Sequence, residues 1–321
     1  MPESVLRLHW RPFQFSLPQA MVTAHGALRE RRGWLLRLEA AGGCLGWGEV
    51  APLAEAYPEV AGLLQELPAE LERHQLESRM SGWPAPVAFA LGAALAELDD
   101  KGSPAGSGWL PPPPSAWLLP AGAGALEALA QLRDQALAPP AFKWKVAALP
   151  AAQELELLER LLDALPQGAR LRLDANGGWD RPTAALWAER LAGDPRLEWL
   201  EQPLDPADQA GLEALAARVP VALDESLRVD PPLRARWRGW QVRRPLLEGD
   251  PRPLLAALQA GQPHWMVSTA LETGIGRRWV HHLAALQAQG PTPTAPGLAP
   301  GWCPQGDLFS VDPWLVWQAA A

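Results

Sequence analysis

The sequence has few cysteines and no long apolar run. Two cysteines among 321 residues, Cys44 and Cys303, lie far apart and form neither a disulfide framework nor a zinc-ligand pattern. No stretch reaches the roughly 20 apolar residues that a membrane-spanning helix requires. The N-terminus has an early acid and no apolar signal core. We therefore expect a reduced, cytoplasmic protein without membrane insertion.

The sequence also lacks an excess of positive charge. Its formal net charge of −8 argues against nucleic acid or an anionic membrane as a main partner. The basic residues are scattered, apart from short groups such as RERR at 29–32, which we expect to form a hairpin turn with solvated charges. With 48% hydrophobic and 20% charged residues, the chain has the composition of a globular protein of one large domain or two unequal ones.

The first hundred residues differ in pattern from the rest. Residues 5–50 predict strands joined by turns, whereas 59–77 and 85–99 carry apolar residues at helical spacing. Residues 101–117 are rich in Gly, Ser and Pro, which indicates a loop or a domain junction. A small α+β domain is therefore expected before this junction.

After the junction, short apolar runs alternate with helix-like segments. Seven such units follow one another, from AWLLP at 116–120 to HWMVST at 264–269 and the helix-like segment after it. This alternation predicts a parallel sheet, and seven or eight units favour a closed (β/α) barrel of the TIM type over an open sheet. No Gly-rich nucleotide-binding loop opens any of the helices.

Lysine is scarce, and two lysines share one strand. Of 28 basic residues only three are lysines, and Lys143 and Lys145 lie two positions apart inside an apolar run. Strand side chains alternate faces, so both should point into the barrel mouth. Arginine would serve at a surface equally well but cannot release a proton near neutral pH, whereas a buried lysine beside another cation can. The pair therefore indicates a lysine base.

Three acids end three consecutive strands. Asp174, Glu201 and Asp224 follow one another at intervals of one strand–helix unit, so they should lie side by side at the barrel mouth. A single acid at a strand end is usually a helix cap, as we expect for Asp180. Three together repel one another unless a cation joins them, and an all-oxygen ligand set suits Mg²⁺. The chemistry indicated is proton abstraction next to a metal-bound substrate carboxylate.

Several motifs resemble the enolase superfamily, muconate-lactonising subgroup: KWK (143–145), LDANGGW (173–179), WLEQPL (199–204), ALDES (222–226) and VRRPLLEG (242–249). GWGEVAPL (46–53) resembles the strand motif of its capping domain. The short length and MVSTALETGIG (266–276) are most similar to the o-succinylbenzoate synthase family. The resemblance implies an α+β cap at residues 1–100, a modified (β/α)7β barrel at 101–297, and a segment, 298–321, that returns to the cap.

The resemblance also implies a reaction. The enzyme would be a hydro-lyase that converts 2-succinyl-6-hydroxy-2,4-cyclohexadiene-1-carboxylate to o-succinylbenzoate in menaquinone or phylloquinone biosynthesis, through a metal-stabilised enediolate. The three acids would bind Mg²⁺, which Mn²⁺ could replace. Lys145 would remove the α-proton and return it to the departing hydroxyl in a syn dehydration. Lys143 would support it and steady the substrate carboxylate.

One position departs from the family pattern. The family has a lysine before the proline that follows the sixth strand, and here that residue is Arg244. In racemases and epimerases the lysine is a second base, which arginine cannot replace. In the synthase it is a cation facing the ring, and a guanidinium serves that role. Arg244 thus disfavours an N-acylamino acid racemase or a dipeptide epimerase.

The sequence leaves two further functions and several residue roles open. The chain could be an enzyme of the muconate-lactonising type, or a catalytically silent barrel that acts as a binding protein. Ser268 and Thr269 would bind a substrate carboxylate or cap a helix. Asn176 and Glu225 are expected to support the metal ligands and the base. The partner is a small-molecule carboxylate, and the sequence does not determine the oligomeric state.

Overall fold

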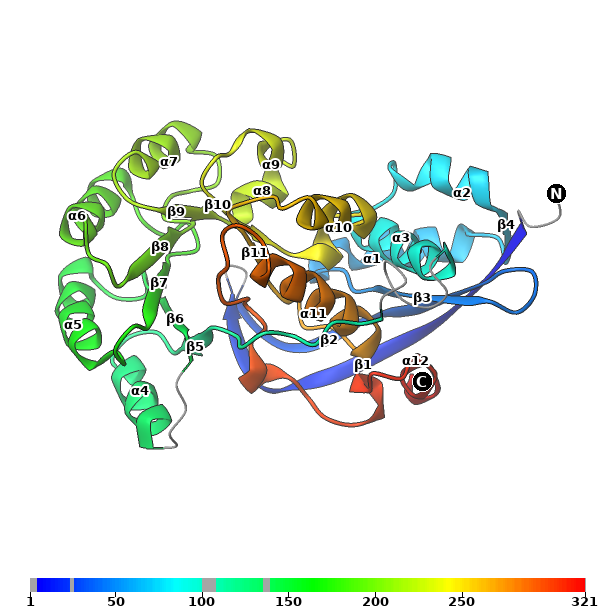
Figure 1. Cartoon of the computed structure of the whole chain (residues 1–321), viewed down its shortest axis with the longest axis horizontal. Helices are drawn as coiled ribbons and strands as arrows, with labels where there is room; N and C mark the ends of the chain where they lie inside the picture. Colours follow the sequence, from blue (N-terminus) through cyan, green and yellow to red (C-terminus); the bar gives the residue numbers. More distant parts are fainter. Residues whose placement is uncertain (1–4, 24–25, 100–107, 135–138, 321) are drawn as a thin grey trace.

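The structure, a computed structural model, describes residues 5–23, 26–99, 108–134 and 139–320. Figure 1 shows an antiparallel sheet beside a curled parallel sheet whose outer side is covered by helices. No helix in these ranges combines the length and apolarity that crossing a bilayer requires.

The antiparallel sheet has the strand order β3-β2-β1-β4. Its elements are β1 (Val5–Thr23), β2 (Gly26–Glu39), β3 (Leu45–Val50) and β4 (Glu70–Glu72), with η2 (Ala54–Ala56), α1 (Tyr57–Glu66), α2 (Arg73–Met80) and α3 (Ala85–Asp99). Helix α3 is apolar on nearly every side and is buried almost throughout its length, as expected for a helix without a polar face.

The motif GWGEV brings α3 unusually close to the sheet. A Cβ atom on Gly46 would lie 1.9 Å from the carbonyl oxygen of Ala94, and one on Gly48 would lie 2.0 Å from that of Ala90. The helix backbone thus occupies the space that side chains would fill. Glycine is required at both positions because no other residue permits this approach.

Two local predictions in this region are wrong. Residues 59–77 form α1, β4 and α2 rather than one helix, since Pro68 cannot continue a helix from Leu67. Residues 29–32 do not form a turn, because β1 and β2 stay paired beyond them, to Thr23 opposite Gly26. Arg31 is consequently a buried strand residue.

The second sheet confirms the predicted barrel. Its seven strands are parallel neighbours in chain order: β5 (Trp117–Leu119), β6 (Ala141–Lys145), β7 (Arg170–Asp174), β8 (Leu197–Glu201), β9 (Val221–Leu223), β10 (Trp240–Arg243) and β11 (Trp265–Val267). The helices between and after them are α4 (Gly124–Asp134), α5 (Ala151–Ala164), α6 (Arg181–Leu191), α7 (Gln209–Ala216), α8 (Glu225–Val229), α9 (Leu233–Arg236), η4 (Pro245–Leu247), α10 (Pro251–Gln259) and α11 (Gly274–Ala288). Asp180 caps α6 through the N–H of Thr183, as predicted.

An eighth segment closes the barrel between β11 and β5. Gly297 forms a parallel bridge with Ser268, just beyond β11. On the other side, the N–H of Ala116 donates to the carbonyl of Pro296 at 2.9 Å. The segment is too short and too rich in proline to be recognised as a strand from its sequence, yet it completes the (β/α)7β arrangement.

Two buried carboxylates fasten the antiparallel sheet and its helices to α11. Glu49, in β3, accepts the N–H of Thr273 at 3.0 Å, at the start of α11, where unpaired N–H groups favour an acid. Glu97, in α3, accepts two contacts of 2.7 Å from Nη2 of Arg278 and one of 3.1 Å from Nε1 of Trp279. These contacts fix the cap-like layer on the barrel.

The chain ends against the antiparallel sheet. After η5 (Pro300–Trp302) and η6 (Asp307–Phe309), α12 (Pro313–Ala319) packs on β3, and the ring of Trp317 lies 5.7 Å from that of Trp47. Nη1 of Arg11, in β1, donates to the Trp317 carbonyl at 3.0 Å. The domain limits at residues 100 and 297 stay a prediction.

Candidate active site

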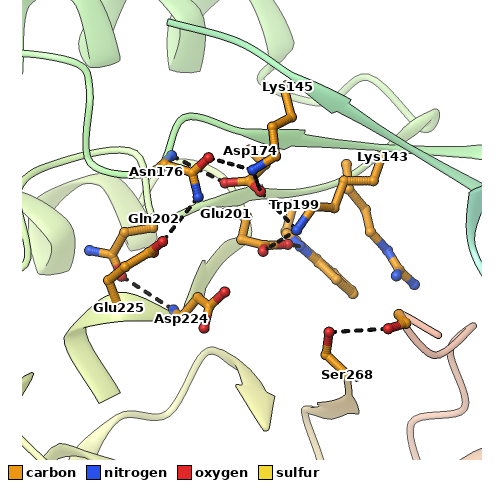
Figure 2. A network of polar contacts seen from close by, with 12 residues as sticks. Lys143, Lys145, Asp174, Asn176, Trp199, Glu201, Gln202, Asp224, Glu225 and Ser268 are labelled. Atoms are coloured by element: carbon orange, nitrogen blue, oxygen red, sulfur yellow. Dashed lines mark hydrogen bonds and ion pairs between the residues drawn. The ribbon is translucent and has the colours of Figure 1, made fainter. Parts of the chain in front are cut away.

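The two lysines of β6 meet the first acid of the site. Lys145 is directly opposite Asp174 in the register of β6 and β7. Both ammonium groups contact the same oxygen, Oδ2 of Asp174, at 2.8 Å from Lys143 and 2.9 Å from Lys145. Figure 2 shows the two side chains reaching this carboxylate from one strand. Burial would raise the pKa of Asp174, but the two ammonium charges hold that pKa well below its usual range.

Glu201 extends the cluster to the next strand. It pairs with Asp174 in the register of β7 and β8, and its Oε1 accepts from Lys143 Nζ at 2.5 Å. Burial would lower the pKa of Lys143, but Asp174 and Glu201 outweigh that effect and hold its pKa above the ordinary value. The pKa of Glu201 itself is raised, chiefly by burial, because Lys143 offsets only part of the cost.

Asp224 and Arg244 form a second ion pair across the mouth. Arg244 Nε donates to Oδ1 of Asp224 at 3.0 Å and Nη2 donates to Oδ2 at 2.5 Å. Nη1 donates to Ser268 Oγ at 3.2 Å and to the Thr269 carbonyl at 2.7 Å. Burial would lower the pKa of Arg244, but Asp224 raises it, so the guanidinium is a permanent cation.

Asn176 and Glu225 continue the network on the other side of Lys145. Lys145 Nζ donates to Oδ1 of Asn176 at 2.5 Å, and Nδ2 of Asn176 donates to Oε1 of Glu225 at 3.0 Å (Figure 2). Burial, together with the charges of Asp224 and Asp174, raises the pKa of Glu225 to about 7. Asn176 thus fixes the position of the ammonium group through an amide rather than through another charge.

Gln202 holds the backbone around the third acid. Its Oε1 accepts the N–H groups of Asp224 at 3.2 Å and Ser226 at 3.0 Å, and its Nε2 donates to Ser226 Oγ at 2.7 Å. Gln202 and Asn176 have φ angles of 36° and 47°, a left-handed conformation that costs most residues free energy. Such strain concentrates where the backbone must present functional groups, here directly after β8 and β7.

Ser268 and Thr269 lie beside Arg244, and their hydroxyl groups already have partners. Ser268 Oγ donates to the Gly297 carbonyl at 3.2 Å, and Thr269 Oγ1 donates to Oε2 of Glu272 at 2.5 Å. The N-cap of α11 is Thr273. The two residues therefore support the wall of the site rather than the start of the helix.

One cavity of about 330 Å³ is lined by most of these residues: Lys143, Lys145, Asn176, Asp224, Glu225, Arg244, Ser268 and Thr269. Its barrel side includes Lys143, Lys145 and Arg244, and its cap side includes Met21, Leu28 and Leu53. Most charged residues lie on the barrel side, whereas the cap side is mainly apolar but includes Arg31 and Glu55. A ligand of this shape would place a polar group at the strand ends and an apolar body against the cap.

The donor set fits a hard divalent cation. As the side chains lie, the described part of the chain contains no group of three acids gathered around one point, since Lys143 and Arg244 occupy the positions between them. Asp174 and Glu201 nevertheless converge on one nitrogen, and Oε2 of Glu225, which is buried, has no hydrogen-bond partner among those residues. Oxygen donors in this number and burial suit Mg²⁺.

Sequence reasoning missed Arg172, which also lines the cavity. Its guanidinium lies 4.2 Å over the ring of Trp199, and Nε donates to Glu198 Oε2 at 2.7 Å. Arg172 precedes Asp174 by two positions, so strand alternation alone places both on one face and could have indicated it. The sequence pattern around Gln202 did not indicate its role, because Gln202 acts by binding the N–H groups of Asp224 and Ser226, which follow a neighbouring strand.

Comparison with known proteins places these residues in a family. A sequence model described as enolase C-terminal domain-like matches residues 125–229. The o-succinylbenzoate synthase of Thermosynechococcus vestitus (strain NIES-2133 / IAM M-273 / BP-1) is 37% identical over 297 residues, covering 87% of this chain and 88% of that protein. The crystal structure of o-succinylbenzoate synthase from Thermosynechococcus elongatus BP-1, complexed with Mg in the active site, aligns with a TM-score of 0.81 at 32% identity, over 97% of this chain and 99% of that one.

A more distant structure supports the fold. The muconate lactonizing enzyme from Pseudomonas fluorescens, complexed with muconolactone, aligns with a TM-score of 0.70 at 21% identity, over 89% of this chain and 85% of that one. At this identity the similarity concerns the fold alone. The cap, the barrel and the near full-length match at 37% identity agree with the resemblance of the motifs. The chain therefore belongs to the o-succinylbenzoate synthase family of the enolase superfamily.

Proposed function

We propose that the protein is an o-succinylbenzoate synthase that dehydrates 2-succinyl-6-hydroxy-2,4-cyclohexadiene-1-carboxylate. The observation that carries the proposal is the convergence of two lysines on a cluster of buried acids at the strand ends, in a chain of this family. The reaction removes the proton from the carbon that bears the carboxylate and breaks the neighbouring C–O bond. The products are o-succinylbenzoate and water, and formation of the aromatic ring supplies much of the driving force.

Lys145 is the proposed base and acid. In its neutral form Nζ would take the proton from the carbon next to the carboxylate, and the resulting ammonium would give it to the departing hydroxyl on the same face. Asn176 and Asp174 hold Nζ at 2.5 and 2.9 Å, which limits the directions from which it meets the substrate. One positioned group thus serves both proton transfers, as a syn elimination requires.

Lys143 and Arg244 are proposed to act through charge alone. The Asp174, Glu201 and Asp224 carboxylates balance the charges of Lys143, Lys145 and Arg244. Lys143 would steady the substrate carboxylate, and Arg244 would face the ring as a fixed cation. Neither role requires a proton to move, which agrees with the raised pKa of both groups, each held above its ordinary value by neighbouring acids despite burial.

Asp174, Glu201 and Asp224 would hold Mg²⁺, with Mn²⁺ as a substitute. When bound, the ion would supply positive charge where negative charge develops on the substrate carboxylate during proton removal. Lys143 and Arg244 would then turn from these acids toward the substrate. With Lys145 protonated, before it acts as a base, the six side chains are neutral in sum, and a divalent ion then leaves a net charge that matches a substrate with two carboxylates.

The presence of Arg244 favours dehydration over racemisation as the activity of this site. A racemase of the same fold needs a base on each face of the substrate, and a guanidinium cannot serve as the second base near neutral pH. Here the guanidinium also donates to both oxygens of Asp224. The proposed product would enter menaquinone or phylloquinone synthesis, and we expect the enzyme to act in the cytoplasm.

The direct test is to incubate the purified protein with the dehydration substrate and Mg²⁺ and to follow the aromatic product by ultraviolet absorbance. We expect product formation that depends on the protein and stops when a chelator is added. A matched reaction without protein measures spontaneous dehydration. Product formation no faster than in that control would refute the proposed function.

A further inference from the structure

The cap side of the cavity is made chiefly from two segments, with Met21 of β1 paired beside the first. Residues 26–28, at the start of β2, form one part, and residues 53–55, after β3, form the other. The two segments are distant in the chain and share no strand pairing at these positions. Side-chain contacts to the segment after β3 therefore contribute to their relative placement.

Arg31 connects the two segments. It belongs to β2, lines the cavity, and has an exposed fraction of 3%. Its Nη1 donates to the carbonyl of Pro52 at 3.0 Å and its Nη2 donates to the carbonyl of Ala51 at 2.8 Å. Both carbonyls immediately precede Leu53, so the guanidinium holds the backbone that presents this residue to the cavity.

Arg31 also lines the same cavity as Thr269, Ala270 and Leu271 of the barrel. Burial lowers the pKa of Arg31, while the negative charges of Glu272, Glu49 and Glu55 act in the opposite direction, with Glu272 the strongest. Glu272 belongs to the barrel segment after β11, where it accepts from Thr269 Oγ1 and from the N–H of Ala270. The buried cation thus contacts the carbonyls of residues 51 and 52 and borders the same cavity as the barrel segment after β11.

Only arginine meets these requirements together. A guanidinium donates along two parallel directions to two successive carbonyls and stays charged when buried. A lysine would keep the charge, but its single nitrogen cannot reproduce the planar two-point contact. A change to lysine therefore separates the geometry of the contact from its charge.

We propose that Arg31 is a positioning residue that sets the cap wall of the substrate cavity through residues 51–53. The proposal rests on the proposed function. All groups assigned to metal binding and proton transfer lie at the ends of barrel strands, so disturbing the cap wall should weaken binding of the substrate body without changing the chemistry there. Arg31 then acts on KM, whereas Lys145 acts on kcat.

The experiment compares Arg31→Lys with Arg32→Lys. Arg32 is the adjacent residue, is exposed, and lies 4.0 Å over the ring of Tyr57, away from the cavity. We expect Arg31→Lys to raise KM about tenfold while kcat stays within about threefold of wild type, and Arg32→Lys to change neither. Magnesium affinity, measured by calorimetry without substrate, should remain within about twofold in both variants.

A double-mutant cycle with Leu53→Ala tests the route of the effect. If Arg31 acts by holding the segment before Leu53, the two changes in KM should combine to less than their product. An unchanged KM in Arg31→Lys, a fall in kcat alone, or fully multiplicative effects would overturn the inference. Wild-type activity is measured first: its absence would refute the proposed function, whereas active wild type with an unaffected Arg31→Lys variant would refute only the role of Arg31.

Discussion

Replacing each lysine of the site by arginine separates proton transfer from charge. Lys143 and Lys145 leave β6 on the same face, have side-chain exposures of 17% and 14%, and both contact Oδ2 of Asp174. Arginine preserves the positive charge at either position and adds the same bulk. It has no accessible neutral form, so it cannot act as a base. The two variants are therefore matched controls for each other.

The structure sets the expected difference between the variants. Both variants place a guanidinium beside Asp174, and this shared part of the cost cancels in the ratio of their rates, although Lys143 also contacts Glu201 and Lys145 contacts Asn176. What remains is the contribution of the general base, typically about 10²–10⁴-fold, or roughly 2.7–5.4 kcal/mol in the activation free energy. We expect Lys145→Arg to be slower than Lys143→Arg by at least the lower of these factors.

The assay is the steady-state rate of aromatic product formation at saturating substrate and Mg²⁺. Circular dichroism and magnesium calorimetry would verify that both variants fold and bind the ion. If Lys145→Arg turns over within a few fold of Lys143→Arg, Lys145 is not the base. If Lys143→Arg is the slower of the two, the roles of the lysines are reversed.

Four further outcomes test other parts of the site and fold. A chelator should abolish turnover and Mg²⁺ or Mn²⁺ should restore it; a fully active metal-free protein would exclude the three acids as essential ion ligands. Arg244→Lys should keep turnover within about tenfold of wild type, whereas Arg244→Ala should lower turnover by a factor of tens or more, since a desolvated cation–π contact contributes ~2 kcal/mol. An Arg244→Ala variant as fast as wild type would show that Arg244 has no role in turnover. One enantiomer of an N-acylamino acid in D₂O should not racemise rapidly, and deuterium in both enantiomers would reveal a second base. Glu97→Ala should lower the free energy of unfolding by about 3–5 kcal/mol in denaturant titrations, because it leaves Arg278 buried without its partner. Asp99→Ala, on the same helix with an exposed arginine partner, should cost less than about 1 kcal/mol, and equal losses would contradict the difference in burial.

The residues at the strand ends of the site could be predicted from the sequence because each strand–helix unit of the barrel ends its strand at the same mouth. Side chains at the C-terminal ends of parallel strands share one mouth, so strand order alone placed Lys145, Asp174 and Glu201 side by side. Strand alternation likewise placed Lys143 with Lys145. These inferences need only local sequence and a repeated unit.

The contacts that cross between units were not predictable in this way. The pairing of Arg244 with Asp224 depends on side-chain directions on two strands, and the burial of Arg31 depends on how far β1 and β2 stay paired. From sequence alone, the charged residues of RERR (29–32) are expected to be exposed to solvent, because the residues that bury Arg31 are distant in the chain. The segment around Gly297 was not recognised as a strand for a related reason. It forms a single isolated bridge, to Ser268, and so has no strand-length sequence pattern.

The position of α12 has a consequence for synthesis of the chain. Trp47 in β3 packs against Trp314 and Trp317, with ring centroids 5.1 and 5.7 Å apart, so nearly the whole sequence separates the partners. At about 5–20 residues per second, the ribosome needs roughly 13–54 s to extend the chain from the end of β3 to the end of α12. During that time an aromatic face of the first sheet has no cover from its own chain. We expect nascent chains that lack α12 to be the form most in need of a chaperone, because Trp47 then lacks its contacts with Trp314 and Trp317.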